Sequence, residues 1–295
     1  MENIENKNPL LEDTTGPNAP EIATTDENLS VDAMYQQAAL PSLGRQIFSV
    51  IPMNGPTAAL FNIRKKSGTT DFELVRAEVE VEPSTSIHTG ISQEAIQDLK
   101  AQYGKEVGTV VGTLLRGLAN DQENEATLAF LASNSVEITV GDALDLTEST
   151  NAEYNAFEIQ QKVHELILRA NSKTMRTYES FCVLPYTTAA TFAALNNYVG
   201  GMDKDERGLF IAEIGNTKYF MNPDPTATTA YVGLKDSLNP SKSSAVFSPY
   251  RSEVVEATNA NTGEATYHIY NRFAITASPL SEAGNEMLFK FTINL

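Results

Sequence analysis

The residues of this chain that could do chemistry begin with three carboxylates in one short segment. Glu78, Glu80 and Glu82 alternate with apolar residues, which predicts one strand face carrying all three at spacings of about 7 Å. Carboxylates in such a row can form an acid–base pair or hold a cation. Because no histidine or asparagine joins them and no pocket is indicated, we interpret them as a solvated face, or as partners for lysine or arginine of an adjacent subunit.

The remaining candidates for chemistry are isolated in the sequence. His88, His164 and His268 are far apart, and Cys182 is the only cysteine. We expect Cys182 to be a core residue and His164, in the middle of a predicted helix, to be packed or on the surface. The sequence has no glycine-rich phosphate loop, Cys-x-x-Cys, His-Glu-x-x-His or nucleophile elbow. We therefore predict no catalytic residue, no cofactor, no metal site and no enzymatic activity.

Charge and hydropathy exclude further classes. The formal net charge of −17 argues against a nucleic-acid-binding protein, because phosphate binding needs clustered lysine and arginine. The same charge is compatible with a shell that encloses DNA without sequence-specific binding. No apolar run is long enough to span a membrane, and no signal peptide is indicated, so we expect no membrane partner. A single cysteine fits a reducing compartment.

A rigid turn lies between two apolar runs at residues 51–57. Pro52 fixes its own φ, Asn54 and Gly55 tolerate positive φ, and Pro56 keeps Gly55 out of the helical region. We call residues 49–57 the knuckle. Its candidate assembly residues are Pro52, Met53, Asn54, Gly55, Pro56 and Thr57.

The elements around the knuckle are a strand and a long helix. Strict alternation predicts a strand at residues 75–82, within a projecting hairpin or extended loop. A helix ending near residue 133 is predicted by apolar residues spaced three and four apart, which are Val107, Val110, Val111, Leu114, Leu115 and Leu118. Gly104, Gly108 and Gly112 recur every four residues, so we expect them to serve close packing or bending of this helix.

The rest of the chain reads as mixed α and β structure. Residues 1–44 are acidic and rich in proline, which predicts a flexible arm with a short helix at 31–39. A second long helix, at 152–173, is expected to bury Phe157, Val163, Leu166, Ile167 and Ala170. Further strands are predicted at 136–140, 181–184, 217–221, 229–232 and 244–247, with a helix at 187–197. Strands at 253–257, 266–277 and 288–293 should pack under the long helix.

Four segments, in the same order, resemble one family. Residues 51–57 (IPMNGPT) resemble the PMNGPTG signature of major capsid proteins of T-even-like contractile-tailed bacteriophages. Residues 95–104 resemble that family's AQDLKAxHG segment, with Ile96 and Tyr103 as departures. Residues 231–235 and 245–250 resemble its VGYKG and FYxPY pair, and residues 270–280 resemble its xxRYxIxxNP strand.

The resemblance implies an α+β, Hong Kong 97-like capsid fold. It implies an arm at 1–44, a junction at 45–66, an extension loop at 67–92, a peripheral domain with the spine helix at 93–151, an axial domain at 152–250, and strands returning to the peripheral domain at 251–295. Glu78, Glu80 and Glu82 would make extension-loop contacts, and Gly104, Gly108 and Gly112 would serve spine packing.

The function implied is that of a major capsid protein. Copies would form hexamers and pentamers of an icosahedral head around double-stranded DNA, assembled in the host cytoplasm and kept in the virion. Scaffold, portal, vertex and decoration proteins are candidate partners. The alternatives are a vertex-only capsid protein or an encapsulin-like nanocompartment shell of the same fold and, from another class, an acidic soluble hydrolase using a carboxylate pair.

Overall fold

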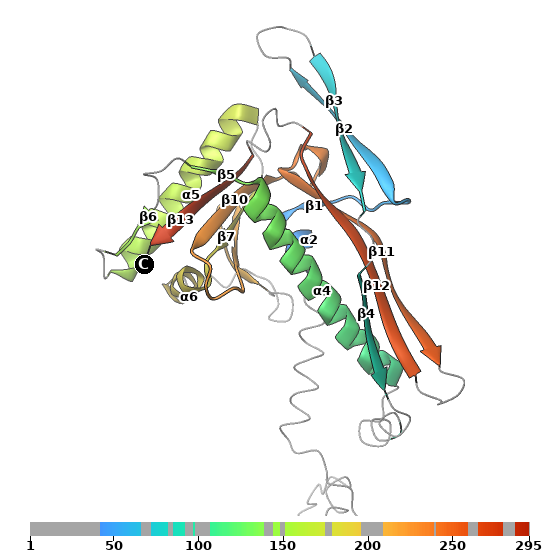
Figure 1. Cartoon of the computed structure of the whole chain (residues 1–295). Coiled ribbons are helices and arrows are strands. Elements are labelled where there is room, and N and C mark those ends of the chain that lie inside the picture. Colours follow the sequence, from blue (N-terminus) through green and yellow to red (C-terminus); the bar gives the residue numbers. More distant parts are fainter. Residues whose placement is uncertain are drawn as a thin grey trace, which may run out of the picture.

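The chain folds into two sheets joined by a short helix, with a hairpin that projects from the junction (Figure 1). The computed structural model describes residues 42–65, 72–81, 85–91, 97, 107–138, 144–147, 151–174, 179–195, 209–238, 240–258, 265–279 and 287–294. The helix expected at 31–39 and most of the predicted arm lie outside these residues. None of the described helices is long and apolar enough to cross a membrane.

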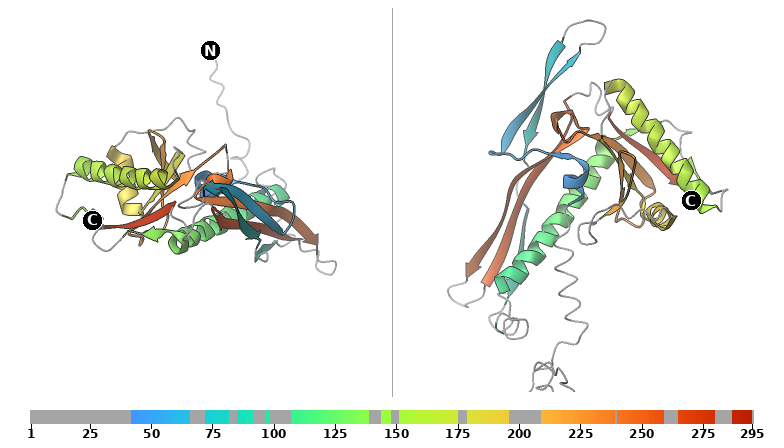
Figure 2. Two further views of the ribbon diagram at one scale, coloured as in Figure 1. Left: turned by 90° about the horizontal axis from the view of Figure 1, so that it is seen from above. Right: turned by 180° about the vertical axis from the view of Figure 1, so that it is seen from behind.

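One half of the subunit consists of a long helix packed against long strands. Helix α4 (Val107–Asn134) runs beside a four-stranded sheet of order β1-β11-β12-β4 (Figures 1 and 2). The strands are β1 (Ser49–Val50), β11 (Ala245–Thr258), β12 (Ala265–Ala277) and β4 (Thr85–Ile91). Apolar side chains spaced four apart on α4, including Val111 and Leu115, pack against Tyr267 and Ile269 of β12. The predicted spine helix is thereby confirmed, although Leu118 is 50% exposed.

The other half is a seven-stranded sheet of order β5-β13-β10-β7-β9-β8, with β6 pairing to β13. Its strands are β5 (Val136–Glu137), β6 (Leu144–Asp145), β7 (Glu179–Leu184), β8 (Phe210–Ile214), β9 (Thr217–Met221), β10 (Thr229–Lys235) and β13 (Leu288–Asn294). Helices α5 (Ala152–Thr174) and α6 (Tyr186–Leu195) pack on one face of this sheet. The short helix α2 (Leu43–Ile47) and the end of α4 cover the other face.

Burial of both faces explains why the strands of this sheet are apolar throughout. In β7, Cys182 and Leu184 join the core under α5 and α6, whereas Phe181 and Val183 join the cluster under α2. Successive side chains of a strand point to opposite faces, so a continuous apolar run marks a strand covered on both sides. The predicted core position of Cys182 is confirmed, since its side chain is fully buried.

Three expectations differ from the structure. We expected the last strand to return to the long helix, but β13 pairs with β10, β5 and β6 in the seven-stranded sheet. Phe289, Phe291 and Ile293 of β13 join the core under α5 and α6, and Leu288 joins the cluster under α2. The strand predicted at 244–247 is instead the start of β11, in the four-stranded sheet. Phe157, expected on the buried side of α5, is 62% exposed.

The projecting hairpin is formed by β2 (Thr57–Lys65) and β3 (Phe72–Glu80). Its root packs on the four-stranded sheet, and its outer part projects away from both sheets (Figure 1). The predicted strand at 75–82 is therefore confirmed, and the hairpin begins directly at the knuckle, ten residues before the expected extension loop at 67–92. After the hairpin, β4 returns to the four-stranded sheet and pairs with β12. A single 3-10 turn, η3 (Pro240–Lys242), precedes β11.

We predict that Gly233→Ala destabilises the subunit and that Gly112→Ala does not. A Cβ at Gly233 would collide with the Phe181 ring and would lie 2.6 Å from Leu288 Cδ2, in a closely packed core. Such overpacking costs about 1–3 kcal/mol of the free energy of unfolding. A Cβ at Gly112 meets no atom within 4 Å, so alanine there gains up to about 1 kcal/mol of helix propensity. Urea unfolding of the soluble subunit measures both, and equal effects would contradict the packing argument.

Candidate assembly site

The knuckle is tied to β11 by backbone hydrogen bonds. The N–H of Ile51 donates to Phe247 O at 3.0 Å, and the N–H of Met53 donates to Pro249 O at 2.9 Å. These bonds continue the parallel pairing of β1 with β11. The N–H of Val81 then donates to Pro56 O at 2.9 Å, which closes the base of the hairpin. The knuckle thus sets where the hairpin leaves the sheet.

Among the candidate assembly residues of the knuckle, Met53 is buried, and its neighbours are exposed or half-buried. Met53 is buried in a small apolar cluster with Leu60, Val79, Val81, Val246 and Ala274. Pro52, Asn54, Pro56 and Thr57 are exposed, and Gly55 is half-buried. Of the predicted knuckle residues, Met53 therefore anchors the hairpin root, and the others present a surface.

Gly55 does not adopt the positive φ that an Asn-Gly turn tolerates. Among the described glycines, positive φ occurs at Gly215, in the turn between β8 and β9, where φ is 62°. A Cβ at Gly55 would lie 3.8 Å from Thr57 O, which is ordinary van der Waals contact. Neither backbone conformation nor crowding inside the subunit requires glycine at position 55.

The hairpin presents an exposed face of mixed chemistry. Phe61 is 53% exposed and Leu74 is 67% exposed. The Arg76 guanidinium lies 6.0 Å from the Phe61 ring centroid, and its Nη2 lies 3.0 Å from Glu78 Oε1. Sequence analysis missed this apolar component because Leu74 and Phe61 come from different strands. Only the register, which places Phe61 opposite Arg76, brings them to one face.

The predicted carboxylate row is partly described. Glu78 and Glu80 are exposed on β3, and Glu82 lies outside the described residues. Glu78 pairs with Arg76 of its own strand, across solvent-exposed side chains. Glu78 and Glu80 thus lie on a projecting strand. Among the described residues, no hydrogen bond or ion pair connects either carboxylate to a histidine.

The spine glycines are described only in part. Gly104 lies outside the described residues, and Gly108 lies in the first turn of α4. Gly112 is open, since a Cβ placed there would have no neighbouring atom within 4 Å. The described part of the subunit therefore supplies no close packing at Gly112, and a contact with another molecule stays a prediction.

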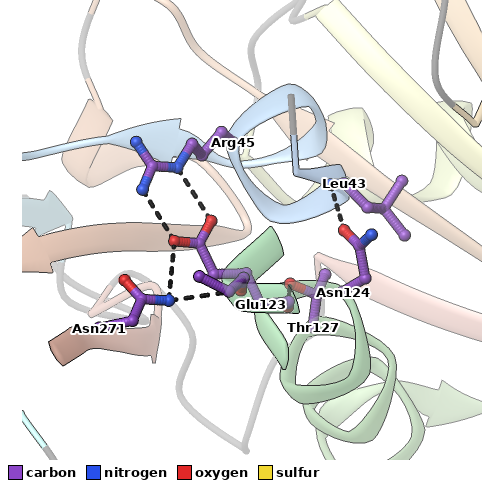
Figure 3. Close-up of polar contacts among 7 residues, drawn as sticks. Leu43, Arg45, Glu123, Asn124, Thr127 and Asn271 are labelled. Atoms are coloured by element: carbon purple, nitrogen blue, oxygen red, sulfur yellow. Dashed lines mark hydrogen bonds and ion pairs between the residues drawn. The ribbon is translucent and has the colours of Figure 1, made fainter. Parts of the chain in front are cut away.

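A polar junction that sequence analysis did not find joins α2, α4 and β12 (Figure 3). Glu123 of α4 is 1% exposed and accepts two hydrogen bonds from Arg45 of α2, Nε to Oε2 at 2.9 Å and Nη2 to Oε1 at 2.8 Å. Asn271 Nδ2 of β12 donates to Glu123 Oε1 and to Ala119 O, each at 3.3 Å. One buried carboxylate therefore links three elements.

The charge of Glu123 and the close approach of α2 to α4 both stabilise this polar junction. The hydrogen bonds and charge of Glu123 raise the pKa of the Arg45 guanidinium, which also lies 5.4 Å from the Phe247 ring centroid. A Cβ at Gly44 would lie 2.5 Å from Thr127 Oγ1, so α2 approaches α4 more closely than a side chain would permit. Residues 42–44, which we assigned to the flexible arm, are buried here.

The isolated histidines and the cysteine are divided between the two sheets: His164 and Cys182 belong to the half with the seven-stranded sheet, and His88 and His268 belong to the four-stranded sheet. His88 and His268 occupy directly opposite positions in β4 and β12, which their sequence separation did not indicate. His164 is exposed on α5, and burial raises the pKa of the Cys182 thiol. Within the described residues, no group of three histidine, cysteine or acidic side chains could hold a metal ion.

Comparison with known protein families gives a match for this chain. The family described as Major capsid protein Gp23 matches residues 65–292. No curated protein sequence matches the chain.

Solved structures share the fold at low sequence identity. A structure titled Mycobacterium phage Che8 has a TM-score of 0.51 at 10% identity, covering 80% of this chain and 84% of that one. The virus-like particle from Pyrococcus furiosus has a TM-score of 0.52 at 10% identity, covering 89% and 98%. The capsid of Ralstonia phage GP4 has a TM-score of 0.51 at 9% identity, covering 88% and 89%.

We predict that Glu123→Gln destabilises the subunit by about 1–3 kcal/mol, because it removes the buried charge with which the partly exposed Arg45 pairs. The matched control is Glu253→Gln, which breaks the pair with Arg251 on exposed side chains and should change stability by less than about 0.5 kcal/mol. Thermal or urea unfolding measures the difference. Similar losses in the two variants would show that the junction contributes no more than a surface ion pair.

Proposed function

The chain belongs to the Gp23 family of major capsid proteins, and from that membership we propose that it assembles into the hexamers and pentamers of an icosahedral phage head. It is a structural protein of a tailed phage with a Hong Kong 97-like fold, and it is not an enzyme. Copies associate with one another in a capsid shell. The family match across residues 65–292 is the observation that carries the proposal.

The hairpin and its knuckle are the proposed joint between neighbouring subunits. Met53 fixes the root of the hairpin, so the exposed face with Phe61 and Leu74 is held out toward another molecule. The charge for lysine or arginine of a neighbour is supplied by Glu78 and Glu80 on β3 and by Glu82, which lies outside the described residues. Apolar contact would supply affinity, and the charges would set register and partner choice.

The spine glycines support a second proposed contact. The open surface at Gly112 permits close approach of another molecule to α4, and Gly104 and Gly108 continue the same four-residue spacing. Each such contact is modest. In a closed symmetric shell every subunit makes many of them at once, so the assembly is far more stable than one contact suggests.

The negative net charge of the chain is compatible with a shell that encloses nucleic acid. A net charge of −17 gives phosphates little to bind, so we infer that double-stranded DNA is enclosed without sequence-specific contacts. Scaffold, portal, vertex and decoration proteins are the proposed partners, and the host cytoplasm is the proposed place of assembly. The order of the four sequence motifs supports placement among T-even-like contractile-tailed phages.

Negative-stain microscopy of the purified protein tests this function. We expect closed shells, tubes or hexameric rings, with scaffold supplied where needed. A uniform monomer at high concentration under those conditions would contradict the proposal. Particles that enclose a protein cargo would favour a nanocompartment, and isolated five-fold rings would favour a vertex-only protein.

We predict that Gly55→Val blocks assembly while the subunit still folds. The space around Gly55 admits a side chain, so soluble expression and unfolding should be close to those of the unmodified chain. A branched side chain on the exposed knuckle would obstruct a neighbour. The smaller Gly55→Ala is the matched control and should assemble. If microscopy showed normal particles from Gly55→Val, the proposal that the knuckle contacts a neighbouring subunit would be wrong.

A further inference from the structure

A groove of about 860 Å³ lies between α4 and the segment that connects β9 to β10. Its lining includes Leu128, Ala129 and Tyr231, which are apolar or aromatic. Three carboxylates, those of Asp121, Glu125 and Asp224, also line it, and no basic side chain is among its described lining residues.

The described part of the chain begins at the edge of this groove. The N–H of Leu43 donates to Asn124 Oδ1 at 2.6 Å, and Asn124 is itself a lining residue (Figure 3). Ser42 is fully buried, and the glycine that follows Leu43 is pressed against Thr127 on the adjoining face of α4. The described chain therefore starts beside the groove, and residues 33–41 are attached to it at that point.

The chemistry of those preceding residues differs from the rest of the N-terminal region. Residues 33–41 (AMYQQAALP) carry no charge, whereas residues 1–32 contain many acidic side chains. A groove lined with carboxylates disfavours an acidic segment, and burial already raises the pKa of Asp121. An uncharged segment with Met34, Tyr35 and Leu40 can cover the apolar lining without placing like charges together.

We propose that residues 33–41 of the same chain occupy this groove. Nine residues span about 13 Å as the predicted helix and about 30 Å when extended, and the α4 face from Asn120 to Ala132 is about 18 Å long, so the segment reaches over most of the groove in either form. Covalent attachment at Ser42 gives the segment a high effective concentration there. The contact lies within one subunit and does not depend on shell assembly.

Engineered cysteine pairs test the proposal in the full-length chain. Each of residues 36–40 is changed to cysteine in turn, together with Ala129→Cys, and mild oxidation is followed on non-reducing gels. The native Cys182 is fully buried and does not compete. One control pairs the same positions with Ala190→Cys, which is exposed on α6, and another pairs Thr15→Cys with Ala129→Cys.

We expect an intrachain disulfide for at least one pair in the series, formed at least about tenfold faster than in either control, because a docked segment is held near its partner. Disulfides that form only between chains would place a neighbour's segment in the groove and overturn the proposal. Equal rates in series and controls, or no disulfide at all, would also overturn it. Microscopy of the same variants reports assembly separately, so a failure of the proposed function is distinguishable.

Discussion

The fold depends on a five-residue helix wedged between the two halves of the subunit. The apolar side chains of α2 share one cluster with Phe181 of the seven-stranded sheet and Phe247 of the four-stranded sheet. On its other side, Arg45 pairs with Glu123 of α4 inside the fold. A buried carboxylate without its partner is strongly unfavourable, so the pair favours the placement of α2 that keeps Arg45 beside Glu123. Because α2 contacts both sheets, this placement helps to fix their relative position.

Much of the local structure could be predicted from the sequence, because local patterns determine it. The spacing of Val111 and Leu115 indicated α4, and the alternation from Val75 to Val81 indicated β3. The continuous apolar run around Cys182 indicated a buried strand. Each pattern is carried by neighbouring residues, and the periods of helix and strand translate it directly into structure. The Hong Kong 97-like fold itself came from the resemblance of four motifs.

The contacts between distant segments could not be predicted in this way. Nothing near Glu123 in the sequence indicates Arg45 or Asn271 as its partners, and no period links Phe61 to Leu74. The pairing of β13 was assigned to the other sheet because a strand's own pattern does not name its neighbour. Gly55 shows a further limit, since an Asn-Gly dipeptide permits positive φ without requiring it.

The hairpin of β2 and β3 has a root that is packed around Met53 and an outer part that neither sheet covers. A two-stranded hairpin alone is only marginally stable in water. Its outer part therefore becomes rigid only when another molecule packs against it. Copies placed in differently curved surroundings can then bend the outer part of the hairpin, beyond the cluster that holds Met53, while its root stays in place. One sequence can thereby satisfy several local geometries, with the adjustment confined to the outer strands of the hairpin.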